Sequence, residues 1–163
     1  AKRVKCPAEF IAGTIKLTGE FREIEPGLPT LDAASVVMGQ KLMDPPTVEG
    51  WHTGKEWIDG GTLTERINFA TARVGNPETP GTKAIIDRLS GSGDPITPAE
   101  LVDGVLNLAG PIEVADETRT ALLQLAELDG DLAFGNSADR TKNEDRIARM
   151  LALAVASREY QFA

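Results

Sequence analysis

Apolar residues recur at intervals of three and four along most of this chain, and this spacing most constrains its fold. Leu63, Ile67, Ala70 and Val74 follow one another at spacings of four, three and four. Such a stripe covers one face of an α-helix. No segment alternates between apolar and polar residues for long enough to predict a strand. The pattern therefore predicts an all-α fold, a compact irregular array of about six to seven helices with a long Trp-containing loop.

Proline, glycine and capping residues divide this pattern into segments. Thr62-Leu63-Thr64-Glu65 and Thr97-Pro98-Ala99-Glu100 both have the spacing of a capping box, and Pro98 would occupy the first helical position of its helix. Paired prolines at 45 and 46 end the second helix. The predicted helices span residues 7–21, 30–43, 63–74, 97–109, 116–128 and 142–160, with a shorter one over 84–89.

The 163 residues are enough for one domain with a real core. Residues 75–97 are rich in proline, glycine and serine, which predicts a loose internal connection. Neither flanking half is a convincing independent domain. The sequence therefore predicts a single helical domain over residues 1–163.

Charge and composition exclude several classes of partner. Acidic residues outnumber basic ones 25 to 17, for a net charge of −8. Nucleic acids and anionic membrane surfaces attract clustered lysine and arginine, so neither is expected as a partner. No apolar run approaches the ~20 residues of a membrane span. Cys6 is the only cysteine, so no intrachain disulfide is possible.

The strongest local feature is the loop of residues 44–61, which holds both tryptophans and the only histidine. Indole rings offer a stacking surface for sugars or cations, and an imidazole offers a titrating nitrogen. Two interpretations stay open: the rings fill a gap between the flanking helices, or they line a ligand surface. The candidate ligand-binding residues are Trp51, His52, Trp57, Arg66 and Asn68, the last two expected to brace the loop by hydrogen bonds.

No complete catalytic or metal-binding set is visible in the sequence. One histidine and one cysteine cannot form a zinc site. Asp129 and Asp131 match the first ligand positions of a calcium loop, but Arg140 occupies its terminal glutamate position. The acidic turn is therefore expected to be solvated. We expect no metal and no cofactor, and we assign no catalytic residue.

Three stretches together resemble a bacterial family known as domain of unknown function 1800. They are Pro7-Ala8-Glu9-Phe10-Ile11, the segment from Met38-Gly39-Gln40 through Pro45-Pro46-Thr47-Val48-Glu49-Gly50-Trp51 to Arg66-Ile67-Asn68-Phe69, and the ending from Leu151 to Gln161. The middle stretch is the most specific, because tryptophan, proline and glycine recur in it at fixed offsets. The chain is similar to the C-terminal part of a longer family member.

This resemblance implies an exported bacterial protein, periplasmic or extracellular, although the chain itself carries no signal peptide. It also implies two possible partners: the N-terminal region of a longer parent protein, or a protein encoded beside it. The family offers no agreed reaction. The expected function is therefore a non-catalytic helical interaction or structural module. The alternative is a carbohydrate-type binding region, or a hydrolytic enzyme region, with a pocket at Trp51, His52 and Trp57.

Overall fold

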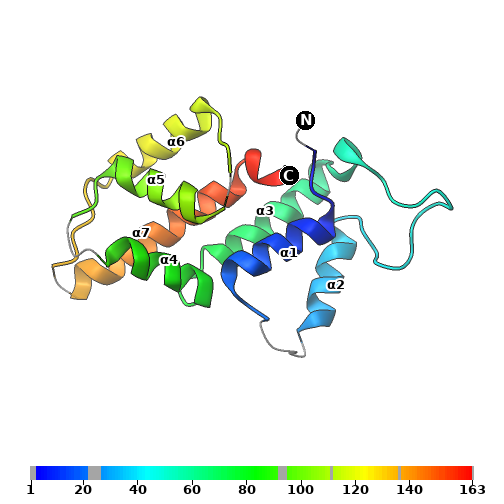
Figure 1. Cartoon of the computed structure of the whole chain (residues 1–163), viewed down its shortest axis with the longest axis horizontal. Coiled ribbons are helices and arrows are strands. Elements are labelled where there is room, and N and C mark those ends of the chain that lie inside the picture. The colour runs from blue at the N-terminus through cyan, green and yellow to red at the C-terminus, as the bar shows by residue number, and fades with distance from the viewer. Residues whose placement is uncertain (1–2, 22–26, 92–94, 111, 136, 163) are drawn as a thin grey trace.

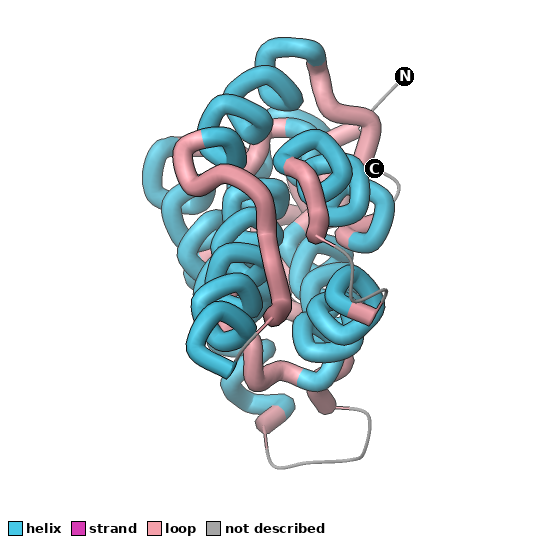
Figure 2. The backbone as a smooth tube through the Cα atoms, turned by 90° about the vertical axis from the view of Figure 1, so that its left-hand side faces the viewer, coloured by secondary structure: helices cyan, strands magenta, loops and turns pink. Residues whose placement is uncertain are grey.

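The computed structural model describes residues 3–21, 27–91, 95–110, 112–135 and 137–162 (Figure 1). Over these residues the chain folds into α-helices joined by loops, with isolated β-bridges and no strand (Figure 2). The helices are α1 (Pro7–Thr18), α2 (Leu28–Val37), α3 (Gly60–Val74), α4 (Pro80–Ser90), α5 (Pro98–Leu108), α6 (Asp116–Glu127) and α7 (Ser137–Ala156), with short 3₁₀ turns η1 (Gly54–Trp57) and η2 (Glu159–Gln161). The predicted all-α array is confirmed.

One hydrophobic core joins these helices. The long helix α7 packs against α3, α4, α5 and α6, and α1 packs against α2, α3 and α4. Phe10, Val74, Val105 and Leu151 are all buried in the same cluster. The stripe predicted for α3 is only partly buried, because Ala70 and Val74 reach the core while Leu63 and Ile67 are half-exposed.

The two ends of the chain pair with each other (Figure 1). Val4 forms an antiparallel bridge with Phe162, and the Lys5 amide donates to the Gln161 carbonyl at 2.8 Å. A second bridge joins Ile96 to Leu132 through two 2.9 Å hydrogen bonds. These pairings join segments that are far apart in sequence, so they constrain how the helices are arranged.

Several helix boundaries differ from the predicted ones. The capping box at Thr97 is confirmed, since its hydroxyl accepts from the Glu100 amide at 3.3 Å. Helix α3 instead begins at Gly60, because Asp59 accepts from the Thr62 amide at 2.8 Å and serves as the N-cap. The first helix ends at Thr18, because Gly19 adopts a left-handed conformation with φ 67°. The second helix spans residues 28–37 rather than 30–43.

The segment predicted as a loose connection contains a full helix. Helix α4 packs against α1, α5 and α7, and its Ile85 and Ile86 are buried in the core. The predicted helix over 84–89 is therefore the middle of a longer one. Residues 92–94 of the same segment lie outside the described residues.

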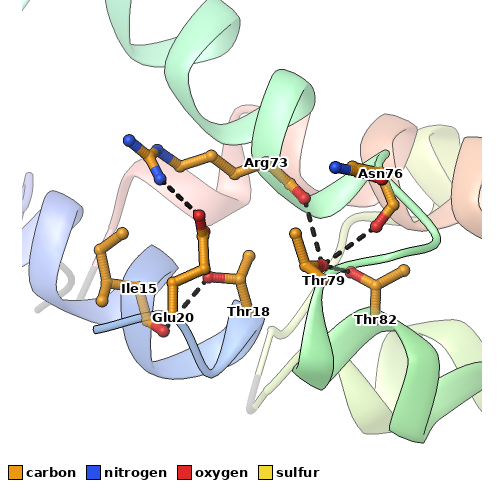
Figure 3. A network of polar contacts seen from close by, with 7 residues as sticks. All are labelled: Ile15, Thr18, Glu20, Arg73, Asn76, Thr79 and Thr82. Atoms are coloured by element: carbon orange, nitrogen blue, oxygen red, sulfur yellow. Dashed lines mark hydrogen bonds and ion pairs between the residues drawn. The ribbon is translucent and has the colours of Figure 1, made fainter. Parts of the chain in front are cut away.

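Polar contacts hold α1, α3 and α4 together (Figure 3). Arg73 of α3 pairs with Glu20, just after α1, at 2.8 Å, and Glu20 also accepts from the Thr18 hydroxyl at 2.7 Å. Thr82 of α4 donates to the Val74 carbonyl at 3.0 Å and lies 2.8 Å from the Thr79 hydroxyl. These contacts position the ends of three helices against one another.

Candidate functional site

The loop between α2 and η1 extends away from the helical body (Figure 1). All side chains from residue 41 to residue 49 are exposed. Gly39, Met43 and Gly50 have positive φ angles of 94°, 67° and 107°, which produce its turns. At its tip the Gly50 amide donates to the Thr47 carbonyl at 3.0 Å. The tip therefore stands away from the helical body.

The base of this loop is compact and contains the predicted aromatic residues. Trp57 is 5% exposed and lies outside the main core cluster. The ring centroids of Trp51 and His52 are 6.4 Å and 6.1 Å from that of Trp57. The Thr62 hydroxyl donates to the Trp57 carbonyl at 3.1 Å, which ties this cluster to the start of α3. Trp57 thus serves as the local anchor of the loop.

The outer face of the cluster is accessible. Trp51 is half-buried and His52 is exposed, with the His52 Nδ1 atom 3.6 Å from a Glu56 carboxylate oxygen. These two rings have the chemistry to stack on a planar or sugar-like group. The structure brings Trp51, His52 and Trp57 together as predicted, and they do not line the groove described below.

The other two candidate residues occupy different surroundings. Arg66 is fully buried, donates from Nη2 to the Lys5 carbonyl at 3.0 Å, and lies over the Phe10 ring at 5.2 Å. Asn68, also on α3, is exposed. The Arg66 guanidinium therefore contacts the N-terminal segment and α1.

Arg66 is electrostatically unusual. Its Nε and Nη1 atoms are buried and have no hydrogen-bond partner. No carboxylate of the described residues lies within ion-pair distance of it. Burial therefore lowers the pKa of the Arg66 guanidinium, because the charged form loses its hydration. We therefore expect the Arg66 charge to contribute little to the stability of the fold.

A cavity lies elsewhere, between α1, α4, the end of α5 and the paired chain ends. This open groove has a volume of about 990 Å³. Its lining includes the cations Lys5, Lys16 and Arg88. Sequence reasoning missed it, because these residues are far apart in the chain. The one available signal was Gly13, a glycine within a helical pattern.

One comparison with known proteins identifies the family. The model of the family described as Protein of unknown function (DUF1800) matches residues 1–162. The chain belongs to this family. Neither a curated protein nor a solved structure matches this DUF1800 chain significantly.

Two further findings on the DUF1800 chain concern metal binding and membrane crossing. Within the described ranges, no three His, Cys, Asp or Glu side chains are grouped so that they could hold a metal ion. No helix among those residues has the length and apolar character needed to cross a membrane.

Replacing the anchor of the loop should affect stability more than replacing its exposed neighbour. We expect Trp57→Leu to lower the free energy of unfolding by about 1–2 kcal/mol, because it removes buried ring area. Trp51→Leu, at a half-buried site, should change it by no more than about 0.5 kcal/mol. Urea denaturation of both variants measures the difference. Equal losses would contradict an anchoring role confined to Trp57.

Proposed function

We propose that this protein is a non-catalytic helical interaction module that binds another polypeptide through α2 and the loop that follows it. The surface in question, the α2 face, consists of Leu28, Val36 and Val37 with Leu42, Met43 and Val48 of the loop. The observation that carries the proposal is that α2 is an apolar helix left largely uncovered.

The composition of α2 is that of a buried helix. Its sequence LPTLDAASVV contains one charged residue, Asp32. A helix that is apolar on all sides is normally surrounded by protein. Here Ser35 is its only buried residue, while Leu28, Val36 and Val37 are 56%, 42% and 56% exposed. A covering partner would remove this apolar surface from water.

The loop after α2 also carries exposed apolar side chains. Leu42 is 46% exposed, and Met43 and Val48 are fully exposed. Large apolar side chains left exposed on neighbouring segments are typical of protein interaction sites. Methionine is well suited to such a site because its side chain is flexible and polarisable.

The family suggests which polypeptide is bound. We propose that the partner is either the N-terminal region of a longer parent protein or a protein encoded beside it, and that the protein acts outside the cytoplasm after export.

Photo-crosslinking tests this function. A benzophenone amino acid is placed at Met43 in cells that make the native protein, with a control at Gln124, an exposed polar position on α6. We expect position 43 to crosslink to one defined polypeptide, and position 124 to yield none. The purified polypeptide is then titrated against the protein by calorimetry. Equal crosslinking from both positions, or no heat of binding, would rule the module out.

A charge on the α2 face should abolish that binding without unfolding the protein. We expect Val37→Asp to weaken the measured affinity by about tenfold or more, since it places a carboxylate in an apolar contact. Its melting temperature should match that of the wild type, because the site is exposed. Thr120→Asp, at an exposed position on α6, is the control with the same charge change.

The alternative of a ligand site at the loop base remains testable because the rings of Trp51 and His52 are accessible. A melt screen against sugars, calcium, zinc and EDTA addresses it. A ligand at 100 times its Kd adds about 2.7 kcal/mol of stability. A clear shift that Trp51→Leu removes would favour the ligand site over the interaction module.

A further inference from the structure

We propose that the groove between α1, α4 and the paired chain ends binds an amphipathic acidic peptide segment of another protein. This groove is distinct from the α2 face. In Figure 1 α2 lies on one side of α1, and α4 and α5 lie on the other. The proposal therefore goes beyond the function proposed above, and the two can fail separately.

The cations in the groove lack acidic partners. Lys16 on α1 and Arg88 on α4 are exposed, and within the described part of the chain no carboxylate lies within ion-pair distance of either. The Lys5 ammonium donates to the Tyr160 carbonyl at 2.8 Å and lies 4.5 Å from the centroid of the Tyr160 ring. In a chain of net charge −8, three cations thus gather in the lining of one groove.

The two acidic residues of the groove are already engaged. The Glu159 carboxylate accepts from the Thr118 hydroxyl at 3.3 Å and from the Ala115 amide at 3.4 Å. These contacts hold it at the start of α6. Glu113 also has a partner. The lining therefore carries three cationic and two anionic side chains, and this excess of positive charge favours an anionic occupant.

The floor of the groove is apolar and has open space. Leu17, Ile85, Leu108 and Phe162 contribute apolar surface. Gly13 lies in the middle of α1, where a Cβ atom would meet nothing within 4 Å. Glycine inside a helix costs about 1 kcal/mol relative to alanine. The missing side chain leaves room for a partner backbone to approach α1 closely.

The placement of the cations favours a peptide over a lipid anion. Lys5, Lys16 and Arg88 come from three separate elements: the N-terminal segment, α1 and α4. A fatty acid carries one carboxylate and can pair with one of these sites. A peptide with several acidic residues beside an apolar face can reach all three, in the manner of a helix bound in a groove.

A selection from a random peptide library displayed on phage identifies the ligand chemistry. The library is first depleted on Gly13→Leu, whose new side chain would fill the floor of the groove, and then selected on the wild-type protein. We expect the retained peptides to carry two or more acidic residues beside apolar ones. A consensus without acidic residues, or no retained peptide, would overturn the proposal.

Variants then locate the bound peptide by fluorescence anisotropy. We expect Lys16→Glu with Arg88→Glu to weaken binding by at least about tenfold, and added salt to weaken binding to the wild type. Each variant is compared with Lys83→Glu, an exposed site on α4 that does not line the groove. That control should bind within about twofold of wild type. An equal loss in the control would reveal nonspecific charge attraction and overturn the site.

Two further measurements separate this site from the alternatives. Gly13→Leu should abolish binding with no decrease in melting temperature, because leucine favours a helix more than glycine does. Val37→Asp should leave peptide binding unchanged, so this groove and the α2 face are tested independently. Displacement of the peptide by sodium laurate, at concentrations below micelle formation, would assign the groove to lipid anions and overturn the proposal.

Discussion

Replacing Gly81 by alanine is expected to lower the free energy of unfolding by about 3–5 kcal/mol. Gly81 lies in the first turn of α4, where that helix contacts the end of α1. A Cβ atom at this position would lie 1.9 Å from the Leu17 carbonyl oxygen and 2.7 Å from the Thr18 carbonyl carbon. Both are backbone atoms, so no side-chain rotation relieves the overlap. The two helices would have to separate.

The end of α1 has little freedom to move away. Thr18 donates to Glu20 at 2.7 Å, and Glu20 is paired with Arg73 of α3 at 2.8 Å (Figure 3). Moving α1 away from Gly81→Ala would therefore disturb these contacts as well. The loss of packing and the loss of polar contacts would both lower the free energy of unfolding.

Gly13→Ala is the matched control for that substitution. It is also a glycine-to-alanine change in a helix, but a Cβ there would meet nothing within 4 Å. It should raise the free energy of unfolding by about 0.5–1 kcal/mol. Urea denaturation of both variants gives the two values. Similar shifts of the same sign would contradict the close contact between α1 and α4.

Replacing Arg146 by methionine is expected to lower the free energy of unfolding by about 3 kcal/mol. Arg146 is a buried residue of α7 that holds the turn after α6. Its Nη2 atom donates to the Gly130 carbonyl at 2.7 Å, and Nη1 donates to Asn143 at 3.3 Å. Its Nε atom lies 3.6 Å from an Asp129 carboxylate oxygen. Methionine would leave these groups without their donor.

Arg66→Met is the informative comparison, because it removes a second buried arginine. Arg66 makes one hydrogen bond, and two of its nitrogens have none. Removing a desolvated charge with so little compensation is often neutral or stabilising. We expect this variant to be at least as stable as the wild type in the same urea experiment. A loss as large as that of Arg146→Met would show that the Arg66 charge is compensated in the fold.

Local patterns predicted the helices well. The capping box at Thr97 formed as expected because its hydrogen bonds join residues three apart in sequence. Helix ends were predicted less well. Gly19 ends α1 early, and Asp59 caps α3 in place of Thr62. Several residues near each helix end could have served as the cap, and helix propensity alone does not select one of them.

The candidate site was predicted in part. Trp51, His52 and Trp57 were expected together, and neighbouring positions in one short loop made this straightforward. Arg66 was expected to brace that loop, yet its guanidinium donates to the Lys5 carbonyl at 3.0 Å. Its position on α3 was predictable, but the segment that its side chain meets was not, because the two residues are 61 positions apart.

The sequence alone determined the helical class, the starts of α1, α5 and α6, and membership in the DUF1800 family, because each depends on residues within a few positions of one another or on a linear motif. Only the tertiary structure decided that α2 is uncovered, that Arg146 is paired while Arg66 is not, and that Lys5, Lys16 and Arg88 line one groove. These features arise where distant segments meet, as when Lys5 reaches the Tyr160 carbonyl across 155 positions. The physical reason is that burial and charge pairing depend on which surfaces come into contact, and helical periodicity does not specify those contacts.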